Sequence, residues 1–252
     1  MKSFIKDKLS VKIYENRDLM GADAAKDVAS CIRALLKEKE EINMIFAAAP
    51  SQNDLLAHLC EEEGIDWGKI NAFHMDEYIG LDPAAPQCFS NFLKDHIFDL
   101  KPFGSVNLIN AGAEKDAEIA RYAALLQAHP IDIVCMGIGE NGHIAFNDPH
   151  VADFNDPALV KAVSLDEKCR QQQVNDGCFK HIDEVPKYAM TLTVPMLMSA
   201  TYKFCVVPAP TKAWAVNETV NGAIGEACPA TVMRISDNCI LYCDADSAAL
   251  LK

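Results

Sequence analysis

Two segments of the sequence combine residue types that could transfer protons. Residues 137–143 read GIGENGH, and Asp148 follows His143 by five residues. A histidine beside a carboxylate is a tunable proton shuttle. A lone histidine would be better explained as a buried side chain satisfied by local hydrogen bonds. Here a second ionisable group, Asp76, follows another apolar run in the segment FHMDEY (73–78), and the pair favours acid–base chemistry.

The glycines of residues 137–142 also match the fingerprint of dinucleotide-binding loops. That fingerprint needs a helix that begins at the second or third glycine, because the pyrophosphate rests on its N-terminus. Asn147, Asp148 and Pro149 would end such a helix within two turns. Glycines also allow a tight turn and close approach of a ligand. We therefore interpret the segment as a turn that presents His143, and expect no nucleotide cofactor.

The elements that must position these residues alternate between strand and helix. Apolar runs predict strands at residues 11–15, 42–49, 70–75, 106–110 and 131–137, and later at KYAMTLTV, KFCVVP, ATVMRI and CILYCD. Helices are expected at 17–38, 88–98 and 114–127, and from Pro50–Ser51 and Thr211, with Ser51 and Asp54 as a capping box. This alternation predicts one α/β domain over residues 1–252, with a mostly parallel, doubly wound sheet covered by helices on both faces. Ligands bind beyond the carboxyl ends of such strands, where Asp76 and His143 lie.

Composition limits the partners that this chain can take. The chain has 252 residues, half of them hydrophobic, and a formal net charge of −13. Such a charge argues against nucleic acid and against an anionic membrane surface, and an anionic substrate would need placed donors. No apolar run is long enough to span a membrane, no signal peptide is recognisable, and the ten cysteines form no C-x-x-C pair. We expect a cytoplasmic protein with free thiols. The irregular stretch 147–157 is interpreted as an active-site loop or flap.

The two segments resemble the signatures of a known enzyme family. FHMDEYIGL (73–81) and DIVCMGIGENGHIAFNDP (132–149) are similar to those of the glucosamine-6-phosphate deaminase (isomerase) family, and the similarity continues in residues 185–192, 206–213 and 239–244. The resemblance implies a Rossmann-like fold without a nucleotide, and a reaction of amino sugar catabolism that needs neither metal nor cofactor. In that reaction a hexosamine 6-phosphate opens its ring, isomerises from aldose to ketose and loses ammonia.

The resemblance also implies roles for individual residues. Asp76 matches the base that moves a proton between C2 and C1, and His143 matches the group that exchanges a proton with the ring oxygen. Asp148 and Asn141 match the residues that orient the histidine. Contacts with the sugar phosphate are expected from six further residues: Ser51, Gln52, Glu77, Gly139, Arg170 and Lys212.

Some positions depart from the family pattern and keep alternatives open. Asp148 stands where the family usually has glutamate, and residues 47–53 (AAAPSQN) replace a Thr/Gly-rich phosphate loop. Pro50 lacks an N–H, Asp54 opposes an anion at the helix start, and the phosphate arginine has no clear match near Asp176. One alternative is a sugar-phosphate-binding protein with altered catalysis. Another is a 6-phosphogluconolactonase-like hydrolase, because those enzymes carry a similar Gly-His turn.

A metal hydrolase is a weaker interpretation of the same residues. His74, Asp76, His143, Asp148 and His150 match no zinc spacing, so no metal is expected. The sequence leaves the oligomeric state open, a homo-oligomer included.

Overall fold

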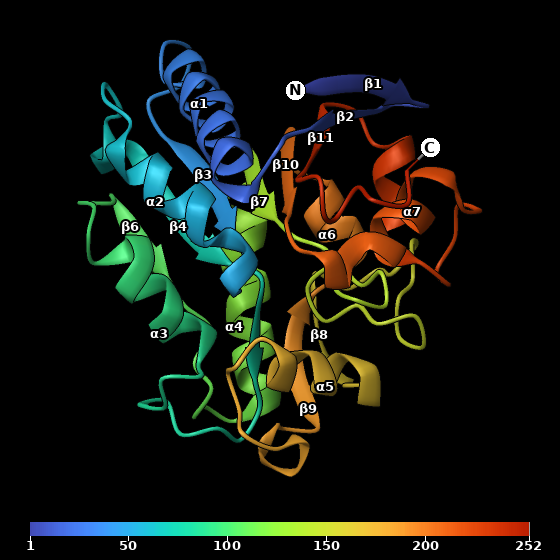
Figure 1. Ribbon diagram of the computed structural model, residues 1–252. Coiled ribbons are helices and arrows are strands. Elements are labelled where there is room, and N and C mark those ends of the chain that lie inside the picture. The colour runs from blue at the N-terminus through green and yellow to red at the C-terminus, as the bar shows by residue number, and fades with distance from the viewer. Residues whose placement is uncertain (252) are drawn as a thin grey trace.

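The computed structural model, which describes residues 1–251, is built on one large sheet (Figure 1). Its strand order is β1-β2-β11-β10-β7-β3-β4-β6. All pairs are parallel except β1–β2. The strands are β1 (Lys2–Lys6), β2 (Leu9–Ile13), β3 (Ile42–Phe46), β4 (Ile70–His74), β6 (Ser105–Asn107), β7 (Ile133–Met136), β10 (Tyr202–Val207) and β11 (Cys239–Cys243). The expected α/β class with a mostly parallel sheet is confirmed.

Helices cover both faces of this sheet. The helices of the structure are α1 (Arg17–Leu35), α2 (Asn53–Glu61), α3 (Phe89–Leu93), α4 (Lys115–Ala128), α5 (Glu167–Asn175), α6 (Val194–Met198) and α7 (Ala213–Asn221); of these, α5 lies beside β8 and β9 rather than on the large sheet (Figure 1). Alternate side chains of a strand point to opposite faces. Met44 and Phe46 of β3 accordingly pack in one apolar cluster with α1, α2 and α3, while Ile45 packs in the other with α4, α6 and α7. Burial on both faces explains why the central strands are continuously apolar.

A second, smaller sheet was not foreseen from the sequence. It contains β5 (Asp76–Tyr78), β9 (Tyr188–Leu192) and β8 (Val160–Ser164) in the order β5-β9-β8, and both of its pairs are antiparallel. Met75 alone separates β4 of the large sheet from β5 of the small one. The carboxylate of Asp76 is therefore held at the junction between the two sheets.

Three other local expectations were wrong. The segment ATVMRI is not a strand but part of the 3-10 helix η6 (Pro229–Ile235), which begins with a proline whose fixed φ suits a helix start. Ser51 does not cap α2, because the 3-10 turn η1 (Pro50–Gln52) precedes that helix and Ser51 lies inside it. Likewise the helix expected from Thr211 begins at Ala213, because Thr211 lies within the 3-10 turn η5 (Pro210–Lys212). The remaining short elements are η2 (Trp67–Lys69), the π-helical turn η3 (Lys94–Phe98) and η4 (Ile182–Glu184).

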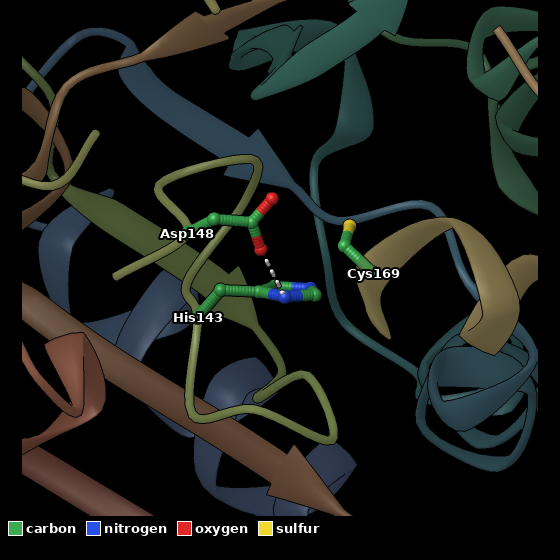
Figure 2. Close-up of side chains that lie close together, drawn as sticks. All are labelled: His143, Asp148 and Cys169. Atoms are coloured by element: carbon green, nitrogen blue, oxygen red, sulfur yellow. Dashed lines mark ion pairs between the residues drawn. The ribbon is translucent and has the colours of Figure 1, made fainter. Parts of the chain in front are cut away.

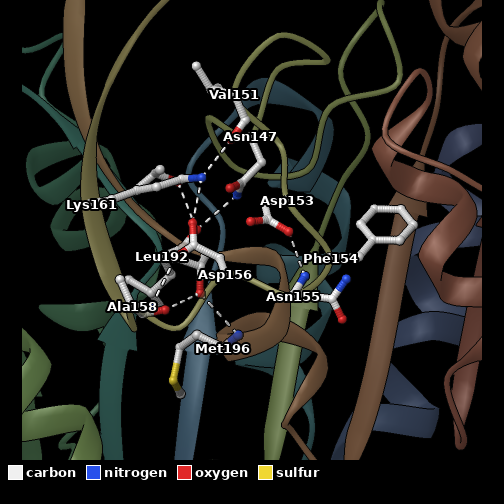
Figure 3. Close-up of polar contacts among 12 residues, drawn as sticks. Asn147, Val151, Asp153, Phe154, Asn155, Asp156, Ala158, Lys161, Leu192 and Met196 are labelled. Carbon is white, nitrogen blue, oxygen red and sulfur yellow. Dashed lines mark hydrogen bonds and ion pairs between the residues drawn. The ribbon is translucent and has the colours of Figure 1, made fainter.

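The loop of residues 147–157 is irregular, as expected, but it is tied down rather than free to act as a flap (Figure 3). The Nζ of Lys161 donates to the carbonyl of Val151 at 2.6 Å and to the carboxylate of Asp156 at 2.8 Å. That carboxylate also accepts from the backbone N–H of Ala158 at 3.0 Å. The amide of Asn147 donates to the carbonyl of Leu192 at 2.8 Å. None of residues 147–157 lines the cavity described below.

Among residues 1–251 the structure has no helix that is both long enough and apolar enough to cross a membrane.

Candidate active site

A cavity opens where the strands β3, β4, β7 and β10 end. It lies at the carboxyl ends of these parallel strands, where ligands of such sheets bind. Its lining falls into two groups. One contains Asp76 and His143, and the other contains Ser51, Gln52 and Lys212. The structure thus brings together five side chains that lie far apart in the sequence.

Asp76 is a buried carboxylate that faces this cavity. It is the first residue of β5, is 6% exposed, and pairs in register with Thr191 of β9. Burial, and then the charge of Glu77, raise the pKa of Asp76 well above its usual range. A carboxyl group with a raised pKa is a stronger base once ionised, and its pKa moves toward the neutral range in which general bases work best.

His143 is oriented by a network of acceptors. Its Nδ1 lies 2.7 Å from the Oδ1 of Asn141 and 3.0 Å from the carboxylate of Asp148. Asn141 in turn uses its Nδ2 to donate to Asp148 and to Asp166, each at 2.9 Å, which fixes the direction of its amide. Because both neighbours of Nδ1 are acceptors, the proton of the neutral ring lies on Nδ1. Nε2 is then left to exchange a proton with a ligand in the cavity.

Asp148 keeps its charge despite being fully buried. Burial acts to raise the pKa of this carboxyl, but the hydrogen bond from His143, the charge of the imidazolium and the bond from Asn141 outweigh it and lower the pKa. The backbone N–H of Asp166 donates to the second oxygen at 3.2 Å. The aspartate side chain is therefore long enough to pair with the histidine, although it is one methylene shorter than glutamate.

The glycines of residues 137–142 make room for this histidine. A Cβ on Gly139 would lie between 2.1 and 2.4 Å from three atoms of the His143 ring. Gly142 has a φ of +84°, and a Cβ there would lie 2.5 Å from the Sγ of Cys228. No helix begins between Gly142 and Pro149. The turn therefore presents His143 and lacks the helix N-terminus on which a pyrophosphate would rest. Gly139 lines the cavity, and its lack of a side chain accommodates the imidazole.

The other group of the lining carries donors suited to an anion. Gln52 is 1% exposed, and its Nε2 donates to the Oγ of Ser51 at 3.1 Å and to the carbonyl of Val206 at 3.4 Å. Its Oε1 is buried without a partner among the described residues. Lys212, 4% exposed, stands at the N-cap position of α7. Burial lowers the pKa of Lys212, while the nearby charges of Asp176 and Glu140 act in the opposite direction.

Two expected substrate contacts, Glu77 and Arg170, lie elsewhere. Neither residue lines the cavity. The carboxylate of Glu77 is fully buried and accepts the backbone N–H groups of Tyr78, Phe89 and Ser90 at 2.9–3.1 Å, so that it fixes the start of α3. The guanidinium of Arg170 donates to the carbonyls of Ile182 and Val185 at 2.6 and 3.0 Å. Both side chains hold the backbone in place, and we withdraw them from the substrate contacts.

Comparison with known proteins places this site in a family. A sequence model described as glucosamine-6-phosphate isomerases/6-phosphogluconolactonase matches residues 15–241. The chain belongs to this family. The family resemblance noted in the sequence is thereby confirmed.

Individual relatives agree with this assignment. The chain is 32% identical over 220 residues to proteins named glucosamine-6-phosphate deaminase in Bacillus thuringiensis (strain Al Hakam) and Bacillus cereus (strain AH820); these matches cover 87% of this chain and 82% of each relative. The solved structure of a monomeric glucosamine-6-phosphate deaminase superposes with a TM-score of 0.85 at 27% identity, over 95% of this chain and 99% of that one. A 6-phosphogluconolactonase from Thermotoga maritima shares the fold, with a TM-score of 0.76 at 17% identity, over 94% of this chain and 99% of that one.

The residues of the cavity that the sequence did not identify as contacts include four polar side chains: Arg17, Gln172, Gln173 and Asp176. The last three come from the end of α5, where positions 172 and 176 share one face of the helix because they are four residues apart. That spacing could have predicted that Gln172 and Asp176 face the same site. Arg17 gave none, because it begins α1 and reaches the cavity only through the packing of α1 on α2.

Two clusters near the site contain atoms of the kind that bind metals. His143, Asp148 and Cys169 each place one such atom within 4.8 Å of the others (Figure 2), as do Asp148, His150 and Asp166. A cation bound by His143 and Asp148 would have to displace the Nδ1 proton and break the pair that orients the ring. The donors thus fit proton transfer better than metal binding. Of the set considered from the sequence, His74 is a structural residue: its Nε2 accepts the N–H of Ile109 at 2.7 Å, and burial together with Lys94 lowers its pKa to about 3.

Proposed function

We propose that this member of the family converts a hexosamine 6-phosphate, glucosamine 6-phosphate or an epimer, into a ketose 6-phosphate and ammonia. The observation that carries the proposal is that Asp76 and His143 line one cavity together with the buried Lys212. A base, a proton shuttle and a buried cation are the three groups that this reaction needs. The names of the relatives that match most of the chain agree with it.

The proposed reaction assigns one step to each group. Nε2 of His143 exchanges a proton with the ring oxygen, which opens the pyranose to the aldehyde. Asp76 then removes the proton from C2 and returns it to C1. The carbonyl oxygen at C1 gains a proton and the amine loses one, so that the aldehyde becomes an alcohol and the C2 amine becomes an imine. Water adds to this imine, and ammonia leaves to give the ketone. Asp148 and Asn141 do not touch the substrate in this scheme; they keep His143 in the tautomer that the first step requires.

A panel of substrates tests the proposal directly. Ammonia release is to be measured with the 6-phosphates of glucosamine, galactosamine and mannosamine, with free glucosamine as the matched compound that lacks the phosphate. Hydrolysis of 6-phosphogluconolactone is to be measured in parallel. We expect ammonia from at least one hexosamine 6-phosphate and none from free glucosamine. Lactone hydrolysis without ammonia release would replace the proposal by a lactonase function. Binding without turnover would indicate a sugar-phosphate-binding protein.

Lys212 is proposed to bind the phosphate, and its removal should weaken binding rather than chemistry. Lys212→Met should raise KM for the phosphorylated sugar about 10- to 150-fold, since a hydrogen bond to a charged group contributes about 1.5–3 kcal/mol. Affinity for an unphosphorylated analogue should hardly change. Lys203→Met is the matched control. Lys203 is also buried and lies on β10, the strand that precedes Lys212. Its Nζ, however, donates to the carbonyl of Ala200, and the residue does not line the cavity. Equal weakening of both ligands would show that the phosphate lies elsewhere.

Asp176 is proposed to weaken binding of the sugar's phosphate group at Lys212. Its carboxylate lines the cavity and acts on the charge of Lys212, so it opposes an anion there. Asp176→Asn should therefore lower KM for the phosphorylated sugar about fivefold, the effect of about 1 kcal/mol of relieved repulsion. The exposed Asp183 supplies a control of equal charge change. A KM that rises in Asp176→Asn would show instead that this carboxylate binds the sugar hydroxyls.

We further propose that one chain forms the complete active unit, since Asp76, His143 and Lys212 line one cavity of one chain. A cytoplasmic location is proposed as well. It is supported by the ten cysteines, all of which are free thiols.

A further inference from the structure

We propose that Arg17 is a second cation of the anion-binding end of the cavity, and that it makes the site selective for a sugar carrying a phosphate monoester. This inference rests on the proposed function and deepens it, because it names a specificity-determining residue of the same site. It starts from the position of Arg17 in the fold.

The start of α1 is fixed against the start of α2. The side chain of Asn16 caps α1 by accepting the N–H of Leu19 at 3.0 Å. One turn further, Gly21 lets the two helices touch, because a Cβ there would lie 2.5 Å from the Cβ of Asp54. This close contact carries Arg17, the first residue of α1, to the loop that precedes α2 and forms part of the cavity wall.

The guanidinium of Arg17 is anchored on that loop by two of its three nitrogens. Its Nε donates to the carboxylate of Asp54 at 2.6 Å, its Nη2 lies 2.5 Å from the same carboxylate, and Nη2 also donates to the carbonyl of Pro50 at 2.9 Å. Within residues 1–251, Nη1 donates to no protein acceptor. An anchored guanidinium with free N–H groups is preorganised for an oxyanion, because little side-chain freedom remains to be lost on binding.

These contacts also change the electrostatics of the loop. An acidic residue in the first turn of a helix disfavours an anion at that N-terminus, and Asp54 lies in the first turn of α2. Its ion pair with Arg17 offsets that charge. Pro50 has no N–H to offer an anion, but its carbonyl holds the guanidinium. A cation on the loop thus supplies donors that the loop backbone cannot.

The neighbouring side chains indicate what the anion carries. Gln52 ties the loop to the end of β10 through the carbonyl of Val206, and Lys212 follows that same strand. Arg17 and Lys212 thus both line the cavity, Arg17 from the start of α1 and Lys212 from the start of α7. The buried Oε1 of Gln52 has no donor among the described residues, and a hydroxyl group of a ligand would supply one. A phosphate monoester on a hydroxylated sugar offers both features, anionic oxygens for the two cations and a hydroxyl for Gln52.

The first experiment distinguishes two possible roles of Arg17: direct contact with the phosphate, and neutralisation of the charge of Asp54. We compare the parent with Arg17→Met, Asp54→Asn and the double variant, using inorganic phosphate as the probe in calorimetry and in thermal-shift titration. If Arg17 contacts the phosphate directly, Arg17→Met should weaken phosphate binding at least tenfold, and the double variant should bind phosphate as weakly as Arg17→Met does. Recovery in the double variant, or unchanged binding in Arg17→Met, would overturn the proposal.

The second experiment uses steady-state kinetics to measure selectivity for the phosphorylated hexosamine over the free hexosamine. Arg17→Met should raise KM for the phosphorylated hexosamine about tenfold and change kcat less than twofold, with no effect on affinity for the free hexosamine. Arg121→Met is the matched control, because Arg121 also pairs with a carboxylate, that of Glu118, but does not line the cavity. If the parent binds phosphate through Arg17 yet releases no ammonia, the proposed function fails while the anion site stands. If ammonia is released and Arg17→Met leaves KM unchanged, the anion site fails alone.

Discussion

Replacing Asp76 with asparagine should lower kcat by about 10²- to 10⁴-fold, the usual contribution of a positioned general base. Asparagine keeps the shape of the side chain and cannot accept the C2 proton, so substrate binding should be nearly unchanged. Ammonia release and the affinity for the hexosamine phosphate measure the two effects separately. Asp95→Asn, on the exposed side of η3, controls for a simple change of charge. An Asp76→Asn variant that turns over within tenfold of the parent would show that another group is the base.

The same substitution should make the protein more stable at neutral pH. The pKa of Asp76 is raised by burial and by Glu77, so the folded protein holds this proton more tightly than the unfolded chain does. The resulting contribution to stability is present below the unfolded pKa of about 3.9 and is lost as the pH rises through the raised folded value. At pH 7 the ionised carboxylate is therefore a cost, and Asp76→Asn should have the higher Tm. This difference should shrink toward pH 4, and a variant less stable than the parent at pH 7 would contradict the burial argument.

Gly139→Ala should lower kcat by about 10²-fold, the effect of displacing a catalytic group by about 1 Å. A methyl group at this position would lie 2.1 Å from Cε1 and 2.2 Å from Nε2 of His143, far inside van der Waals contact. The imidazole must then move away from its bonds to Asn141 and Asp148, and Nε2 can no longer reach the ring oxygen. Steady-state kinetics on a hexosamine 6-phosphate measure the loss.

A matched glycine distinguishes this local effect from general damage. Gly225→Ala is the control, because a Cβ at Gly225 meets no atom within 4 Å and its φ is not positive. Binding of inorganic phosphate should be retained in Gly139→Ala, since Lys212 and Arg17 are untouched. A kcat within threefold of the parent would mean that the ring has room that the structure does not show.

The parts of the site that could be predicted depend on short-range rules. His143 and Asp148 are five residues apart, and the strand-end rule for parallel sheets places Asp76 beside them. The same kind of rule could have removed Glu77, because neighbouring residues of a strand point to opposite faces. With Asp76 facing the cavity, Glu77 points into the protein and binds the backbone of Phe89 and Ser90.

The parts that could not be predicted depend on how distant elements pack. Arg170 has the residue type of an anion ligand, yet its side chain meets the carbonyls of a 3-10 turn twelve or more residues later. Arg17 reaches the cavity because Gly21 permits a helix contact that no local pattern announces. The small antiparallel sheet was missed because β5 is only three residues long, begins with two acidic residues and follows β4 after a single residue, so no apolar run marks it.

That single-residue junction at Met75 has a consequence for motion in this molecule. If the small sheet rotates slightly against the large one when a ligand enters, each atom is displaced in proportion to its distance from the axis through the junction. Asp76 is the first residue after the junction and would stay almost still, whereas α5, which follows β8 of the small sheet, would move with that sheet. The helix would then close on the substrate without disturbing the base. Amide hydrogen exchange measured with and without phosphate should show protection that grows from β5 toward the end of α5.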